Sequence, residues 1–117
     1  MLNILIIDDD EDMLKIINLV LKASGYNVET ATNGKEGIRK FDAGAFDLVI
    51  TDMRMPDLDG NDVAQYIRES VRDFIPIIGI SGTLWLLEND NFDMIIQKPF
   101  TTKRLIDSIK ELTSQND

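Results

Sequence analysis

The sequence contains neither cysteine nor histidine. Without these residues the chain cannot form disulfides or the usual zinc sites, and it cannot use a cysteine nucleophile or a triad with an imidazole base. Any chemistry must therefore be carried by carboxylates, hydroxyls and amines. A chain of 117 residues buries roughly two thirds of its unfolded surface and can fold without such cross-links.

Positive charge is also scarce, because 12 Lys and Arg stand against 21 Asp and Glu, which gives a net charge of -9. Nucleic acids and anionic membrane surfaces favour clustered Lys and Arg, so we expect no direct binding to nucleic acid. The N-terminal segment lacks the basic start of a signal peptide, and no apolar run reaches the roughly 18 residues of a membrane span. We expect a cytoplasmic protein without membrane insertion.

No stretch rich in Gly, Pro or Ser divides the sequence, so we expect one domain over residues 1–117 and no output domain. Short β-branched runs alternate with candidate helices, and they lie at residues 4–7, 27–30, 48–51, 75–80 and 94–97. Alternating βα units predict an α/β fold with a parallel sheet and helices on both faces. The run at 27–30 alternates in polarity and is typical of an edge strand.

The helices are predicted from apolar side chains that share one helical face. Three segments have such a face: Met13, Ile16, Ile17, Val20 and Leu21; Val63, Ala64, Ile67 and Val71; and Leu105, Ile106, Ile109 and Leu112. Residues 34–41 offer only two clear apolar anchors after an Asn-Gly turn signal, which indicates a short surface helix.

Charged or polar residues follow four of the predicted strands. They are Asp8 and Asp9 after the first strand, Asp52 after the third, Ser81 after the fourth and Lys98 after the fifth. The carboxyl ends of parallel strands share one rim of the sheet, where sites form. Two carboxylates about 4 Å apart repel by about 4 kcal/mol at an effective dielectric of about 20. The rim therefore predicts a cation, and an oxygen-only donor set favours Mg²⁺.

These motifs together resemble response-regulator receiver domains of two-component signalling. The family has an acidic pair after the first strand and D-x-x-M-P-x-x-D-G at the third, which here are IIDDDED and DMRMPDLDG. A hydroxyl residue followed by a small one matches Ser81-Gly82, and Lys-Pro after the fifth strand matches Lys98-Pro99. The resemblance covers essentially the whole chain. It implies a flavodoxin-like (βα)5 fold, doubly wound, with five parallel strands in the order 2-1-3-4-5.

The resemblance also implies how the chain works. Asp52 would accept a phosphoryl group, Ser81 would bond a phosphoryl oxygen, and Lys98 would pair with the carboxylate before transfer and with the phosphoryl group afterwards. The donor would be a sensor histidine kinase or a phosphotransfer protein, and the phosphorylated domain would bind a downstream target that the sequence does not identify. Such a protein catalyses only its own phosphorylation and dephosphorylation, so we do not expect an enzyme.

The same resemblance assigns the ligands of the metal. Asp9 would bind Mg²⁺ directly, Asp8 directly or through water, and Asp52 and the backbone carbonyl of Arg54 would complete the protein ligands. A plainer interpretation is that residues 8–12 form only a helix N-cap and an acidic first turn. For Met53 and Met55 we favour packing in the loop over a binding surface.

Two features depart from the family. Only residues 82–97 separate Ser81 from Lys98, so the fourth helix is predicted to be short or irregular. The fifth strand carries Ile95 where the family tends to have an aromatic switch residue, so a hydroxyl movement at Ser81 that reorganises residues 83–87 is an alternative relay. Leu84, Trp85, Leu86 and Leu87 could form a partner-binding patch or could cover the sheet.

Two other functions share parts of this pattern. A haloacid-dehalogenase-like phosphatase also uses an aspartyl nucleophile with Mg²⁺, but it needs a second Asp two residues later, where this chain has Arg54. A binding module with the receiver fold that acts without phosphorylation is the other alternative. Metal binding without phosphorylation would favour that module.

Overall fold

The computed structural model describes residues 2–82 and 91–113 of the chain. Five strands form its centre: β1 (Asn3–Ile7), β2 (Asn27–Ala31), β3 (Leu48–Asp52), β4 (Ile77–Ser81) and β5 (Met94–Gln97). Each predicted strand is present, with ends within two residues of the prediction. Asp52 and Ser81 are the last residues of their strands, and do not lie beyond them.

The described helices are α1 (Glu11–Ala23), α2 (Gly34–Ala43), α3 (Gly60–Arg68) and α4 (Thr102–Leu112). A polar side chain caps the amino end of each helix by accepting backbone N–H bonds, and these caps are Asp10, Asn33, Asp59 and Thr101. Such caps satisfy amide groups that have no partner within the helix. They fix where each helix starts after its strand.

All strand pairs are parallel and follow the order β2-β1-β3-β4-β5, which confirms the predicted topology. Every residue of β3 and β4 is buried, whereas burial alternates along β2. Central parallel strands are covered on both faces, and an edge strand is not. The polarity of each run therefore follows its place in the sheet.

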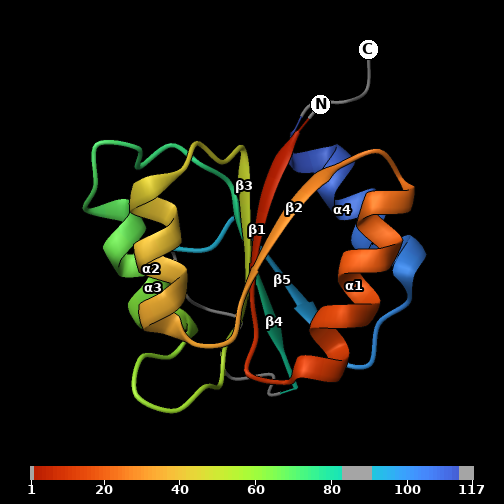
Figure 1. Cartoon of the computed structure of the whole chain (residues 1–117), viewed down its shortest axis with the longest axis horizontal. Coiled ribbons are helices and arrows are strands. Elements are labelled where there is room, and N and C mark those ends of the chain that lie inside the picture. Colours follow the sequence, from red (N-terminus) through yellow and green to blue (C-terminus); the bar gives the residue numbers. More distant parts are fainter. Residues whose placement is uncertain (1, 83–90, 114–117) are drawn as a thin grey trace.

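The sheet lies between two pairs of helices, with α1 and α4 on one face and α2 and α3 on the other (Figure 1). One apolar cluster joins α1 and α4 to the sheet through side chains such as Leu21, Ile50 and Ile109. A second cluster on the opposite face contains Phe41, Val49 and Ile67. These two layers pack against opposite faces of the sheet and so bring the ends of neighbouring strands to one rim.

Two side chains predicted to lie on apolar helix faces are exposed instead. Val71 is 94% exposed because α3 ends at Arg68, where the Ser70 hydroxyl donates to the Ile67 carbonyl and a turn begins. Ile16 is 54% exposed at the margin of the α1 face that Ile17 buries. The predictions for the fourth helix and for residues 83–87 lie outside the described residues.

Candidate functional site

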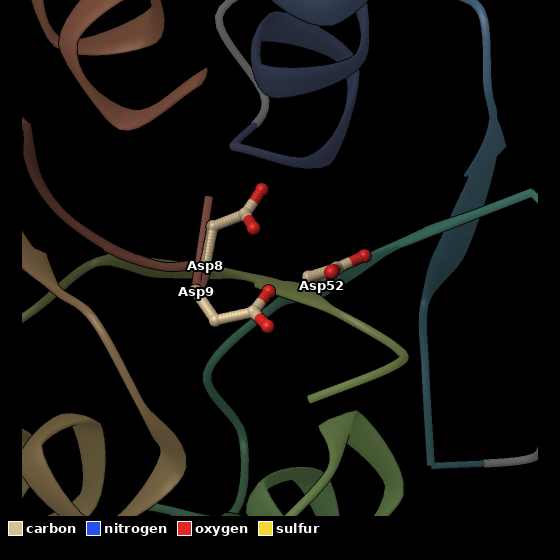
Figure 2. Close-up of side chains that lie close together, drawn as sticks. All are labelled: Asp8, Asp9 and Asp52. Carbon is tan, nitrogen blue, oxygen red and sulfur yellow. The ribbon is translucent and has the colours of Figure 1, made fainter. Parts of the chain in front are cut away.

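Three carboxylates meet at the carboxyl end of the sheet, where the strand order reverses between β1 and β3. Ile7 pairs with Thr51 in the register of these strands, which brings Asp8 level with Asp52. One oxygen of Asp8, one of Asp9 and one of Asp52 lie within 4.8 Å of one another. Figure 2 shows the three side chains extending from the ends of these two strands. The predicted carboxylate cluster is confirmed.

The backbone around Asp8 fixes the direction of its carboxyl group. The Asp8 N–H donates to the Ala31 carbonyl at 3.0 Å, which extends the pairing of β1 with β2. The Asp10 N–H donates to Asp8 Oδ1 at 2.9 Å, while the Asp10 side chain caps α1. Asp8 Oδ2 is buried and has no hydrogen-bond partner among the described residues. A buried carboxylate oxygen in this state requires a cation, a proton or a water molecule.

The acidic segment 8–12 divides into two parts with different positions in the structure. Asp10 forms the helix cap, and Glu11 and Asp12 lie in the first turn of α1. Asp8 and Asp9 belong to the carboxylate cluster. The sequence did not indicate that the Asp10 backbone also orients Asp8, because side-chain patterns carry no information on that amide.

Burial makes the charged forms of two of these carboxyl groups costly. Burial raises the pKa of Asp8 from 3.8 to about 6, against the hydrogen bond from Asp10, and the negative charges of Asp52 and Asp9 add to the rise. Burial also raises the pKa of Asp52, and the positive charge of Lys98 opposes this rise. The site is thus short of positive charge, because desolvation and like charges both disfavour ionised carboxylates.

Lys98 supplies a cation to the site from two strands away. Its Nζ lies 3.3 Å from Asp52 Oδ1, and its backbone N–H donates to the Ser81 carbonyl at 2.8 Å. Because β4 lies between β3 and β5, the Lys98 side chain crosses the end of β4, where Ser81 is 2% exposed. Asp52, Ser81 and Lys98 therefore meet at one rim, as predicted.

The loop after β3 contains two buried methionines with an exposed arginine between them. Met53 and Met55 are 1% and 8% exposed, which confirms that they pack in the interior. Arg54, between them, has an exposed side chain. Its backbone carbonyl lies two residues after Asp52 in the chain, and its predicted role as a metal ligand stays a prediction.

The residues present fit a divalent cation with oxygen ligands. Carboxylates from Asp8, Asp9 and Asp52 converge, one buried Asp8 oxygen has no partner among the described residues, and Lys98 is the neighbouring ammonium. Mg²⁺ binds carboxylates while keeping coordination positions for water and phosphate. With no Cys or His in the sequence, softer metals lack their preferred ligands.

Comparison with known proteins agrees with this geometry. The profile of the response regulator receiver domain matches residues 4–110. The chain is similar to a probable transcriptional regulator, ycf27, of Cyanidium caldarium, with 36% identity over 108 residues that cover 88% of this chain and 43% of that protein. It spans about half or less of the length of the first curated relatives it matches.

Solved structures share the whole fold. A response regulator receiver domain protein of Clostridium thermocellum is 29% identical with a TM-score of 0.89, covering 98% of this chain and 96% of that one. The response regulator TrrA of Thermotoga maritima, solved in complex with Mg²⁺–BeF, is 32% identical with a TM-score of 0.88, covering 96% and 99%.

In the part of the chain that the structure describes, no helix has the length and apolar character needed to cross a membrane. The family profile spans most of the sequence, and the fold and the carboxylate cluster match what the motifs predicted. The chain belongs to the response regulator receiver domain family of two-component systems.

Proposed function

We propose that this domain is a switch that accepts a phosphoryl group on Asp52 in a Mg²⁺-dependent reaction. The observation that carries the proposal is the meeting of three carboxylates within 4.8 Å with an ammonium 3.3 Å from one of them. Phosphoryl transfer needs a positioned nucleophile and concentrated positive charge, with little further covalent chemistry. Asp52 is the candidate nucleophile because it faces Lys98 at the strand end.

In the proposed reaction, a carboxylate oxygen of Asp52 attacks the phosphorus of a phosphohistidine. The bond between phosphorus and nitrogen breaks, and its electron pair stays on the imidazole of the donor. Lys98 holds the carboxylate before transfer and a phosphoryl oxygen afterwards, and the Ser81 hydroxyl donates to another phosphoryl oxygen. Lys98 acts in this reaction as a cation and not as a base, because its ammonium pairs with the carboxylate of Asp52.

Asp8, Asp9, Asp52 and the backbone carbonyl of Arg54 would hold the metal. When bound, Mg²⁺ supplies positive charge that neutralises the carboxylates and the phosphoryl oxygens together. The buried, unpartnered Oδ2 of Asp8 supports this assignment. The other Asp8 oxygen is already bonded to the Asp10 amide, so one oxygen is left to face the metal or its water.

The phosphoryl donor in this proposal is a sensor histidine kinase or a phosphotransfer protein. The chain has no histidine, so the phosphohistidine must come from another protein or another domain. A downstream target then binds the phosphorylated form. We propose no turnover of external phosphate esters, because Arg54 occupies the position where an aspartyl phosphatase needs its second acid.

The test is intact-protein mass spectrometry after incubation with acetyl phosphate, with and without Mg²⁺. The parent should gain one phosphoryl group only with Mg²⁺, and Asp52→Asn should gain none. Asp57→Asn is the matched control, because Asp57 is an exposed acid of the same loop whose left-handed backbone (φ 67°) suits Asn. An unmodified parent that still binds Mg²⁺ would favour the phosphorylation-independent module. Phosphate release from an added ester would favour a phosphatase.

A further inference from the structure

Gly79 leaves a pit in one face of the sheet, and two side chains fill it. A Cβ atom placed on Gly79 would lie 2.7 Å from the sulfur of Met53 and 2.9 Å from two ring carbons of Phe92. Real Cβ atoms do not approach other atoms this closely, so any larger residue would displace one of these side chains. The Gly79 pit, formed by Gly79, Met53 and Phe92, thus brings side chains from the loop after β3 and from the segment before β5 to one point over β4.

The pit lies next to both groups that would contact a phosphoryl group. Met53 directly follows Asp52, and its N–H donates to the Ile80 carbonyl at 2.9 Å, which joins the ends of β3 and β4. Gly79 is two residues before Ser81 on the same strand. A change in the distance between Asp52 and Ser81 therefore changes the width of the pit.

The far wall of the pit is held at its backbone by hydrogen bonds, while the Phe92 ring is half-buried and packs against the apolar cluster of this face. Arg68 donates to the Asn91 carbonyl at 3.0 Å and pairs with Asp93 at 2.7 Å, and the Asp93 N–H donates to the Ile77 carbonyl at 2.9 Å. The residues on both sides of Phe92 are thus tied to α3 and β4. With the backbone held on both sides of Phe92, its half-buried ring is the part of this segment that is left to move.

We propose that Met53 and Phe92, which together fill the space over Gly79, relay the phosphorylation state of Asp52 to the surface beside β5. This inference rests on the proposed function. A phosphoryl group bonded to both Asp52 and Ser81 draws the ends of β3 and β4 together, which narrows the pit. The flexible thioether of Met53 repacks, and the Phe92 ring turns outward and becomes more exposed. Interiors packed this tightly respond by discrete rearrangement.

This relay differs from an aromatic switch within the fifth strand. The register pairs Gly79 with Ile95, so position 95 borders the same face of the sheet but carries no ring. Phe92 brings an aromatic ring to this face from three residues earlier in the chain. The conformational change would then start at Met53, the residue after the phosphoacceptor. The Ser81 hydroxyl would need no aromatic partner in β5.

The test is ¹⁹F NMR of protein labelled with 4-fluorophenylalanine at its five Phe residues. Phe92→Leu assigns the signal of Phe92. Mg²⁺ with beryllofluoride, an analogue of the phosphoryl group, should shift this signal and increase its sensitivity to solvent in the parent. Phe41 of α2 is buried in the apolar cluster between this helix and the sheet. Its signal should stay unchanged and serves as the internal control.

Met53→Ala removes one of the two side chains that fill the Gly79 pit and should lose at least about half of the Phe92 shift, because the proposed relay passes through Met53. Its phosphorylation by acetyl phosphate should stay close to that of the parent. Met13→Ala is the control, since Met13 packs against the apolar cluster on the opposite face of the sheet; it should keep the shift. Gly79→Ala, which fills the pit, should move the Phe92 signal before any analogue is added.

A Phe92 signal that stays unchanged in phosphorylated parent protein would overturn the relay and leave the proposed function intact. An equally large shift in Met53→Ala would overturn it too. If Met53→Ala fails to fold, Gly79→Ala is the deciding variant. An unaltered Phe92 signal in Gly79→Ala would contradict the placement of this ring against position 79. Absence of any phosphoryl adduct in the mass measurement would contradict the proposed function itself.

Discussion

The ammonium of Lys98 lies 3.3 Å from the carboxylate of Asp52, and the two residues come from strands that do not neighbour each other. Asp52 is 6% exposed, and burial raises its pKa while Lys98 opposes the rise. Lys98 therefore places a positive charge beside Asp52 within a cluster of like charges. The chemistry proposed for the site depends on this pair.

Replacing Lys98 with Met should slow phosphorylation of Asp52 by acetyl phosphate by about 10²-fold, the typical loss when one group that stabilises transition-state charge is removed. A time course of intact mass measures this rate. Lys103→Met is the matched control, because Lys103 forms an exposed ion pair with Asp107 on the surface of α4. Equal rates for the two variants would show that Lys98 has no part in the reaction.

Replacing Asp9 with Asn should stabilise the metal-free protein and weaken Mg²⁺ binding. The substitution removes one of three negative charges within 4.8 Å of one another, and relief of about 1 kcal/mol corresponds to a few degrees in the melting temperature. Thermal unfolding with and without Mg²⁺ measures both effects. Asp73→Asn, an exposed acid before β4 at the other end of the sheet, should change neither. A lower melting temperature for metal-free Asp9→Asn would argue against repulsion in the cluster.

The metal-free protein should lose stability as the pH rises from about 4 to above 6. Asp8 has a pKa of about 6 in the folded protein, above its ordinary 3.8, so between these values the folded state holds a proton that the unfolded state has lost. The free energy of unfolding therefore falls with rising pH. The fall due to Asp8 is at most about 3 kcal/mol, since one pKa unit equals about 1.4 kcal/mol.

Urea unfolding across this pH range measures the effect, and Asp8→Asn isolates it. The variant should lose the part of the fall that comes from Asp8, while Asp52, whose pKa burial also raises, keeps its own part. Saturating Mg²⁺ should reduce the pH dependence of the parent by replacing the proton with a cation. If the free energy of unfolding of Asp8→Asn fell with pH as steeply as that of the parent, groups other than Asp8 would account for the fall.

Replacing Gly60 with Ala should lower the free energy of unfolding by about 1–3 kcal/mol, the usual effect of overpacking. A Cβ atom there would lie 2.6 Å from the Asp52 carbonyl oxygen and 2.8 Å from Met53 Cα, and both are backbone atoms. Gly82→Ala is the control, because a Cβ at Gly82 would have no neighbour within 4 Å among residues 2–82 and 91–113. Urea unfolding compares the two variants, and equal stability would contradict the tight fit at Gly60.

Hydrophobic patterning predicted the fold well because the strands are clearly more apolar than the segments that flank them in the sequence. Apolar runs such as residues 48–51 suit the centre of a parallel sheet, where both faces of a strand are buried. The order of the strands followed from the family resemblance. The pattern could not show where α3 ends, because Val71 continues the apolar spacing beyond Arg68. The turn there is set by hydrogen bonds of Ser70 and Arg68 that leave no mark on hydrophobic spacing.

The site was predictable as a set of residue types but not as a set of contacts. The sequence placed Asp8, Asp9, Asp52, Ser81 and Lys98 at strand ends, and the parallel topology brings them to one rim. The burial that raises the pKa of Asp8 depends on the surrounding fold, so it was not accessible from the residues alone. The Gly79 pit was missed for a related reason, since a glycine does not show which side chains approach it.

The most direct test of the account is the position of the phosphoryl group itself. Protein phosphorylated with acetyl phosphate and Mg²⁺ is reduced with borohydride, which converts an aspartyl phosphate into homoserine, and tandem mass spectrometry locates the altered residue. The account predicts homoserine at position 52 and at no other aspartate, and no conversion without Mg²⁺. Homoserine at position 8 or 9 in place of position 52, or a phosphorylated protein with no reducible aspartate, would contradict it.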